Sequence, residues 1–308
     1  MASPSPPPLV ALRTYAAIRM SMVAVIVGLG LSVALEIRRV DGCVQRSLSA
    51  YYYTPVRPVF VGTLIALGVA MIALWGKTPA EDAFLNLAGI LAAVVAFVPT
   101  LDANSCGLPS GMRATALAQV PGRSLDDALI DANAPAVHNN FLVLVAVIVI
   151  ALAGTAVAAV ARVGRGTTPS GPRRLGYAVT WLGAAVAVVV LLVVYRGADD
   201  NASFFNHGLH SWSAVALFAF VVLAVGAAAV KKRADSGAPT GCEATYWLLA
   251  ATMVGSALVI GLTGAAAGAD GWYGRHSTFL IEAVLIVLLA VFWIVQTIDR
   301  RHEGAPTY

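Results

Sequence analysis

Charged residues are scarce in this chain. Asp, Glu, Lys and Arg make up 12% of the 308 residues, whereas hydrophobic residues make up 59%. Soluble domains have roughly 25% charged residues. A surface that faces water on all sides is therefore excluded. A soluble chain of this length would often form two domains, but the composition does not support that interpretation.

Motifs that would name an activity are also missing. The sequence has no nucleotide-binding loop, haem motif, Ser-His-Asp arrangement or lipidation box. It has no basic–aromatic platform, so the net charge of +4 does not indicate nucleic-acid binding. No cleavable signal peptide is predicted, because Glu36, Arg38 and Arg39 follow the first apolar stretch where small residues would be needed.

What the chain has in abundance is long apolar stretches. A helix needs about 20 mostly apolar residues to cross a hydrocarbon core of roughly 30 Å. Only helices and closed barrels satisfy their backbone hydrogen bonds there, and barrel strands would alternate polar with apolar residues, which Phe141–Ala161 does not. We therefore predict an all-α, polytopic transmembrane bundle of about eight spans. These are Ala16–Ile37, Val59–Trp75, Phe84–Thr100, Phe141–Ala161, Tyr177–Tyr195, Ser213–Val230, Tyr246–Ala267 and Phe279–Ile298.

The spans form one predicted transmembrane domain over 15–298, between a disordered cytoplasmic tail at 1–14 and a cytoplasmic tail at 299–308. Basic residues near spans resist translocation. Placing the N-terminus inside puts most of the 20 Lys and Arg residues in the cytoplasm, above all Arg162–Arg174 and Lys231–Arg233. The sequence thus predicts an N-in, C-in protein of the plasma or inner membrane, with membrane lipids as its neighbours.

The predicted outer loops carry most of the unusual residues. The loop 101–136 is long, and Ser124-Leu-Asp-Asp127 has the form of a capping box that opens a short surface helix. Cys43 and Cys106 fall on the outer side and Cys242 on the inner side. An outer disulfide between Cys43 and Cys106 is one interpretation, and two unrelated small apolar residues are the other.

Histidines gather at the predicted outer ends of the spans. His207 and His210 are three residues apart and would share a face on a helical turn, although Gly208 lies between them. Imidazole and carboxylate together suit zinc. The alternative is that these histidines are simply hydrated side chains at the helix ends and bind no metal. The absence of a His-Glu-x-x-His motif and of a Cys-x-x-Cys pair favours this alternative. The candidate ligands are His138, His207, His210 and His276, with Asp102 nearby.

Glu282 lies inside the last predicted span. An ionisable residue there is by default a functional candidate, and its other interpretation is a carboxyl that fastens helices together, with Arg275 or Arg196 as partner. Before the second span, the three tyrosines of Ser47–Tyr53 fit an interfacial aromatic belt. The serines of this segment are candidates for a nucleophile or a ligand, but no base is adjacent to them in sequence. Glycines predicted to allow close helix packing are Gly28, Gly30, Gly255, Gly261, Gly264 and Gly268, and the alternative for Gly264-x-x-x-Gly268 is the end of a helix.

The segment Ser47-Leu-Ser-Ala-Tyr-Tyr52, followed by Val59-Phe-Val-Gly62, resembles a family of uncharacterised bacterial polytopic membrane proteins that carry Ser-Ile-Ser-Ala-Tyr-Tyr before the second span. The resemblance leaves Ala103–Ala198 uncovered, and the family's members are shorter, which implies that the fourth and fifth spans are an added hairpin. It continues at Asn86-Leu-Ala-Gly89, Pro99-Thr100, His210-Ser-Trp-Ser-Ala214 and the Glu282 span ending near Trp293.

The chain is also distantly similar to ceramidase-like membrane hydrolases. Those are seven-span proteins in which histidines, an aspartate and a serine surround zinc and cleave lipid amides. This sequence departs from them in its His-x-x-His spacing and in its eight predicted spans. By residue type, the resemblance implies a zinc site and catalytic roles for His207, His210, His276, Asp102 and Ser49.

Three functions remain open at this point. The first is an outward-facing polar pocket for a lipid or envelope-associated ligand, where metal-bound water would hydrolyse the substrate and Glu282 or Asp102 would manage protons. The second is a transporter or channel, for which the sequence shows no clear internal repeat. The third is a non-catalytic assembly or sensing subunit. The sequence alone does not decide whether the protein is an enzyme.

Overall fold

The computed structural model describes residues 9–98, 100, 125–164, 171–196 and 208–301. Every regular element in these ranges is helical, which confirms the predicted all-α fold. The elements are α1 (Leu9–Arg39), η1 (Ser49–Tyr53), α2 (Arg57–Ala73), α3 (Pro79–Phe97), α5 (Leu125–Gly164), α6 (Gly171–Arg196), α8 (Leu209–Ser236), α9 (Gly241–Ala267) and α10 (Trp272–Asp299).

The helices have the length and surface of membrane spans. Within the described residues, seven of them are long and apolar enough to cross a membrane. Their outward faces carry large apolar side chains, such as Leu248 and Leu262, which are 67% and 70% exposed. Lipid rather than water suits such a surface, so the chain is a multi-pass membrane protein. The shorter α2 has 17 residues, about 25 Å of helix, and follows the buried turn η1.

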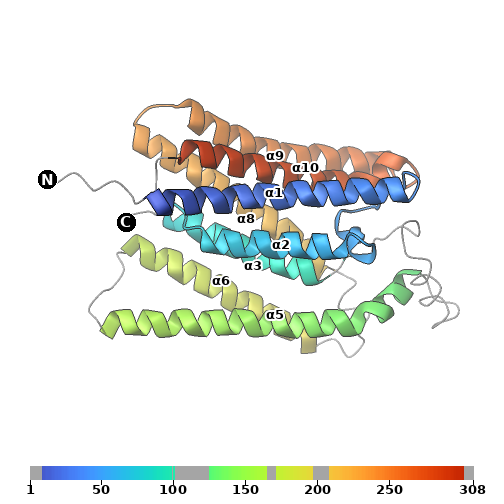
Figure 1. Ribbon diagram of the computed structural model, residues 1–308, viewed down its shortest axis with the longest axis horizontal. Coiled ribbons are helices and arrows are strands. Elements are labelled where there is room, and N and C mark those ends of the chain that lie inside the picture. The colour runs from blue at the N-terminus through green and yellow to red at the C-terminus, as the bar shows by residue number, and fades with distance from the viewer. Residues whose placement is uncertain (1–8, 99, 101–124, 165–170, 197–207, 302–308) are drawn as a thin grey trace.

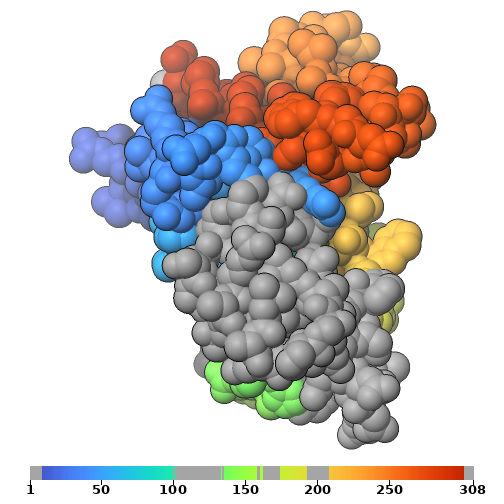
Figure 2. Space-filling model, turned by 90° about the vertical axis from the view of Figure 1, so that its right-hand side faces the viewer, coloured from blue at the N-terminus to red at the C-terminus, as the bar shows by residue number. Residues whose placement is uncertain are grey.

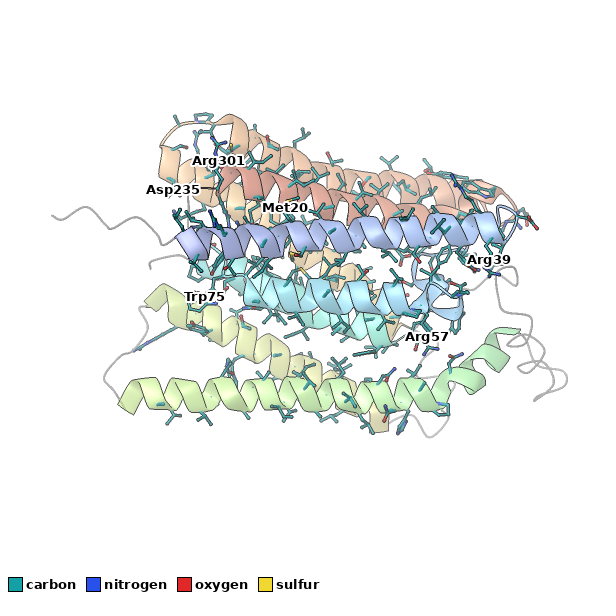
Figure 3. All side chains as sticks on the ribbon, viewed as in Figure 1. Met20, Arg39, Arg57, Trp75, Asp235 and Arg301 are labelled. Carbon is teal, nitrogen blue, oxygen red and sulfur yellow. The ribbon has the colours of Figure 1, made fainter. Side chains whose placement is uncertain are left out.

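The helices run side by side, and the two ends of the bundle can be told apart (Figure 1). We call them the η1 end, where α1 ends and α10 begins, and the Arg301 end, where α1 begins and α10 ends. Figure 3 shows Arg39 and Arg57 at the η1 end and Trp75, Asp235 and Arg301 at the Arg301 end. The chain thus returns to the side where α1 starts, as an even number of crossings requires. The compartment that each end faces stays a prediction.

The interior consists of two apolar clusters. The larger cluster joins α1, η1, α2, α3, α8, α9 and α10, and its largest fully buried side chain is Trp293. The smaller one packs Phe141 of α5 and Leu191 of α6 against Val94 and Val98 at the end of α3. The α5–α6 hairpin therefore attaches to the bundle through α3, while its origin as an added unit stays a prediction.

Close backbone contact occurs at glycines, but mostly not at the predicted ones. A Cβ atom on Gly89 of α3 would lie 2.6 Å from the carbonyl oxygen of Gly68 on α2, so the two helices meet without side chains between them. Of the predicted glycines, Gly264 has such a contact, because a Cβ there would lie 2.4 Å from that of Ser277. The expectation is wrong for Gly28, Gly30 and Gly255, around which a Cβ would meet open space. Gly268 is the C-cap of α9, which agrees with its alternative interpretation as a helix end.

The predicted surface helix after Ser124 is continuous with the fourth span. Helix α5 begins at Leu125 and extends over 40 residues with Pro135 inside it. Figure 1 shows a bend in its first part. A proline inside a helix removes one backbone hydrogen bond and crowds the preceding turn, which accounts for a bend without a break. Ser124 itself lies outside the described residues.

Candidate functional site

Three polar side chains from α10, η1 and α8 form a hydrogen-bonded row at the η1 end. The Ser49 Oγ lies 3.1 Å from the Glu282 Oε1 and 2.8 Å from the His210 Nε2. Ser49 and His210 are buried, at 3% and 5% exposure, and Glu282 is half-buried. The sequence marked all three residues, but as candidates for different tasks. The structure brings them together.

The Glu282 carboxylate also holds the start of η1. Its Oε2 accepts hydrogen bonds from the backbone N–H groups of Leu48, at 2.6 Å, and Ser49, at 3.4 Å. The Ser47 Oγ accepts the N–H of Ala50 at 3.0 Å. The first N–H groups of a helical turn have no partner within the turn, so the carboxylate satisfies two donors, the N–H groups of Leu48 and Ser49, that burial would otherwise leave unpaired. The Ala50 N–H also donates to the Ser47 carbonyl oxygen, at 3.3 Å.

The three tyrosines of η1 are buried and do not form the predicted lipid-facing belt. Tyr51, Tyr52 and Tyr53 are at most 2% exposed. The guanidinium of Arg57 lies 3.9 Å from the ring centre of Tyr52 and donates to its hydroxyl, and it reaches Asn133 of α5 at 3.2 Å. Burial raises the pKa of Tyr51 to about 12 and also raises that of Tyr52, against the opposing charge of Arg57. Both phenols therefore act as neutral packing groups.

The hydrogens of the row can be placed in two ways. The His210 Nδ1 faces the carbonyl oxygen of Val98, which only accepts, so Nδ1 carries a hydrogen. Between Nε2 and the Glu282 oxygen, Ser49 has one hydroxyl hydrogen for two contacts. Either a neutral Glu282 donates to Ser49 and Ser49 to His210, or a charged His210 donates to Ser49 and Ser49 to the carboxylate. Both arrangements hold the same number of protons and differ by moving one proton along the row.

His276 fastens α10 to the segment before η1. Its Nδ1 lies 2.6 Å from the carbonyl oxygen of Trp272, and its Nε2 lies 3.2 Å from that of Val44. The Trp272 ring stacks on the imidazole, with the two ring centres 4.6 Å apart. The N–H of Phe279 donates to the carbonyl oxygen of Arg46 nearby. In Figure 2, which faces this end, the blue segment after α1 extends to the orange and red atoms of α9 and α10.

The predicted metal ligands do not assemble within the described part of the chain, where no group of three or more His, Cys, Asp and Glu is placed to hold a metal ion. His210 and His276 direct both ring nitrogens at protein partners. A zinc ligand must offer a nitrogen lone pair, which neither imidazole leaves free here. His138 is half-buried on α5. His207 and Asp102 lie outside the described residues, so the zinc site stays a prediction.

The cysteines differ in state. Cys43 is disulfide-bonded, whereas Cys242 is an exposed free thiol at the start of α9. Cys106 lies outside the described residues, so its pairing with Cys43 stays a prediction.

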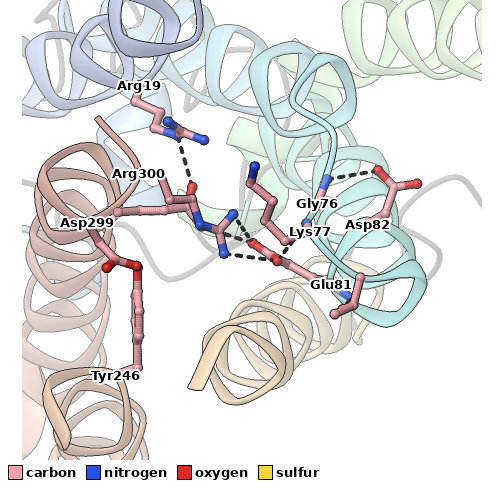
Figure 4. A network of polar contacts seen from close by, with 10 residues as sticks. Arg19, Gly76, Lys77, Glu81, Asp82, Tyr246, Asp299 and Arg300 are labelled. Atoms are coloured by element: carbon pink, nitrogen blue, oxygen red, sulfur yellow. Dashed lines mark hydrogen bonds and ion pairs between the residues drawn. The ribbon is translucent and has the colours of Figure 1, made fainter. Parts of the chain in front are cut away.

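Sequence reasoning missed a second polar cluster, at the Arg301 end (Figure 4). The fully buried Glu81 carboxylate accepts hydrogen bonds from both terminal nitrogens of Arg300, at 2.8 and 3.1 Å, and from Gln296 at 3.0 Å. A local signal was present: Thr78 and Glu81 have the spacing of a capping box, and the Thr78 Oγ1 accepts the N–H of Glu81. The partners are more than 200 positions away, which no local pattern reveals.

No protein-family model, curated protein or solved structure matches this chain. The geometry of the two clusters is therefore what bears on function.

Proposed function

We propose that the η1 end hydrolyses an ester or amide of a lipid or envelope-associated substrate, with Ser49 as nucleophile and His210 as its base. The contact of 2.8 Å between the Ser49 Oγ and the His210 Nε2 carries this proposal. The Val98 carbonyl orients the imidazole through Nδ1. A hydroxyl within reach of a base, which a third group orients in turn, is the usual arrangement of an activated nucleophile.

The reaction follows from these positions. The Ser49 Oγ attacks the substrate carbonyl carbon while its proton passes to the His210 Nε2. The imidazolium then gives that proton to the departing alcohol or amine, which leaves an acyl-serine. A water molecule, deprotonated by His210, attacks the acyl group, and the proton returned by His210 restores the Ser49 hydroxyl as the acid departs.

Backbone donors for the developing negative charge lie next to the nucleophile. The N–H groups of Leu48 and Ser49 now hold the Oε2 of Glu282. Donors that accommodate a carboxylate oxygen also suit the oxyanion of a tetrahedral intermediate. In this proposal Glu282 holds η1 in place at rest and moves aside for the substrate. This role differs from the proton management expected from the sequence.

Burial defines the substrate class. Ser49 is enclosed within a membrane bundle, so a bulky polymer in water has no direct route to it. A lipid-like molecule can approach from the bilayer that surrounds the helices. A metal-bound water would require His210 to give up its contact with Ser49 or Val98, and for that reason we favour the serine over the metal as the source of the nucleophile.

The test is covalent labelling with a fluorophosphonate, which forms an oxygen–phosphorus bond to an activated serine as fluoride leaves. Purified protein in micelles should gain one adduct, located at Ser49 by mass spectrometry. Ser49→Ala should abolish it, and His210→Gln should slow it by roughly 100-fold or more because the base is lost. Ser47→Ala is the matched control, since Ser47 is equally buried in the same segment but contacts a backbone N–H, and it should label normally. Absence of an adduct on the wild type would refute the serine mechanism.

A second candidate, a proton-coupled transporter, is favoured by the two proton arrangements of the row. An ionisable residue within a membrane bundle commonly belongs to a proton relay. Here one proton can move between Glu282 and His210 through Ser49 without changing the total charge.

This candidate is tested in proteoliposomes that contain a pH-sensitive dye, under an inward proton gradient and with a panel of small solutes outside. The wild type should acidify the interior when its solute is present, and Glu282→Gln should not, because the amide holds no exchangeable acid proton. Glu243→Gln, on α9 at the opposite end, is the control. Equal acidification by the wild type and Glu282→Gln would dismiss transport through this row.

A further inference from the structure

Among the described residues, the buried cluster at the Arg301 end brings two guanidinium groups near one carboxylate. The guanidinium groups of Arg19 and Arg300 are 3% and 5% exposed, and the Glu81 carboxylate that pairs with Arg300 is fully buried. The Glu81 carboxylate accepts from Arg300 and Gln296 and not from Arg19. Figure 4 shows Arg19 and Arg300 close together at this end.

Two neighbouring carboxylates in the described part of the chain have other partners. Asp299 accepts from Lys232 and from the Tyr246 hydroxyl, and Asp82 accepts from the Gly76 N–H and from Asn86. Neither is hydrogen-bonded to Arg19. Neither carboxylate therefore pairs with the guanidinium of Arg19.

Arg19 has unused donors. Its Nε donates to the Gln296 Oε1 at 3.0 Å, and its guanidinium lies 5.7 Å from the ring centre of Tyr15. Across the described residues, the two terminal nitrogens of Arg19 donate to no hydrogen-bond acceptor. A buried cation whose donors lack acceptors destabilises a fold. An anion beside these nitrogens would remove that cost.

The depth of Arg19 indicates where the anion comes from. On α1, apolar residues predominate between Arg19 and the buried Glu36, a separation that corresponds to about 26 Å of helix. The hydrocarbon core of a bilayer is roughly 30 Å thick. Arg19 therefore lies close to one edge of that core, next to the level of the lipid phosphates.

We propose that Arg19, with Arg300 beside it, binds a phosphate group, and that an anionic phospholipid of the leaflet at the Arg301 end supplies it. Guanidinium groups bind phosphate through two parallel hydrogen bonds, which matches the two unused terminal nitrogens of Arg19. The bound lipid would connect α1, α3 and α10 at the end opposite the Ser49 row. This inference is independent of the proposed hydrolysis.

The test is native mass spectrometry of the purified full chain in micelles with added phosphatidylglycerol, phosphatidylcholine or inorganic phosphate. The wild type should retain phosphatidylglycerol about tenfold better than phosphatidylcholine, as expected for one charge-assisted contact. Arg19→Gln should lose this preference. Arg13→Gln, which removes the same charge from an exposed position of the same helix, should keep it.

The other possible outcomes also distinguish between a lipid site, a site for free phosphate and no site. Binding of inorganic phosphate by the wild type, lost in Arg19→Gln and displacing no lipid, would keep the phosphate site but assign it to free phosphate. Equal retention of both lipids by the wild type, or an equal loss in Arg13→Gln and Arg19→Gln, would overturn the proposal. If Arg19→Gln does not fold, Arg19→Lys retains the charge without the planar fork, and it should bind phosphatidylglycerol less tightly than the wild type does.

Discussion

At the residue scale, the chemistry depends on contacts between distant positions. Ser49 is 161 positions from His210 and 233 from Glu282. Sequence reasoning identified each of them, because a polar residue in or beside an apolar span needs an explanation. It found no base for the serine, because the base comes from another helix. Residue types were predictable, whereas their proximity required the fold.

The buried phenol of Tyr51 makes stability depend on alkaline pH. Its folded-state pKa is about 12, above the ordinary value of 10.0, because burial disfavours the phenolate. The unfolded chain therefore releases this proton first as the pH rises, and stability falls between about pH 10 and 12. We expect the melting temperature of the wild type to decline more steeply over this range than that of Tyr51→Phe.

The comparison rests on the slope with pH. Tyr51→Phe also removes the acceptor of the Gln45 N–H, so its stability at neutral pH will differ from that of the wild type. The difference in tyrosinate absorbance between the two proteins gives an independent readout and should rise near pH 12. A difference spectrum already complete at pH 10 would show that the phenol is not shielded.

At the element scale, helix contacts depend on which face of each helix turns inward. The sequence offered many glycines, and the periodicity of nearly all-apolar helices does not identify the inward face. This is why Gly28 and Gly30 were expected at contacts and lie in open space, whereas Gly68 and Gly89 bring α2 against α3. The existence of the helices was predictable because it depends on local apolar length. Their contacts were not, because in lipid both faces are apolar.

The α2–α3 contact predicts opposite effects for the same substitution at two glycines. Gly89→Ala places a methyl group 2.6 Å from the Gly68 carbonyl oxygen, so the helices must separate, at a cost of about 1–3 kcal/mol. Gly62→Ala on α2 meets open space and should be neutral or stabilise by up to about 1 kcal/mol, because alanine favours helix. Denaturant unfolding in micelles measures both. A loss of stability in Gly62→Ala as large as that in Gly89→Ala would contradict the assigned contact.

At the scale of the whole molecule, the two polar clusters lie at opposite ends of an apolar bundle. The larger apolar core, with residues such as Met22 and Phe292, lies among the same helices. The described helices therefore form a bundle with an apolar middle and a polar cluster at each end. The helical class of the spans followed from the need to satisfy backbone groups in lipid. The short α2 overlaps the second predicted span, Val59–Trp75, whereas seven of the described helices are long and apolar enough to cross a membrane. The buried turn η1 before α2 did not follow from the sequence, because burial of its tyrosines depends on α10 and Arg57.

The orientation of the molecule can be tested with its own free thiol. Cys242 is exposed at the start of α9, at the Arg301 end, where Lys231, Lys232 and Arg233 lie near the end of α8. Because basic residues resist translocation, this end should face the cytoplasm. A membrane-impermeant maleimide should therefore label Cys242 only after the cells are broken. Asp270→Cys in a Cys242→Ser background places a thiol in the exposed turn before α10, at the η1 end, and should be labelled on intact cells.

Labelling of Cys242 on intact cells, with Asp270→Cys protected, would place the Ser49 row in the cytoplasmic half and make its substrate a lipid of the inner leaflet.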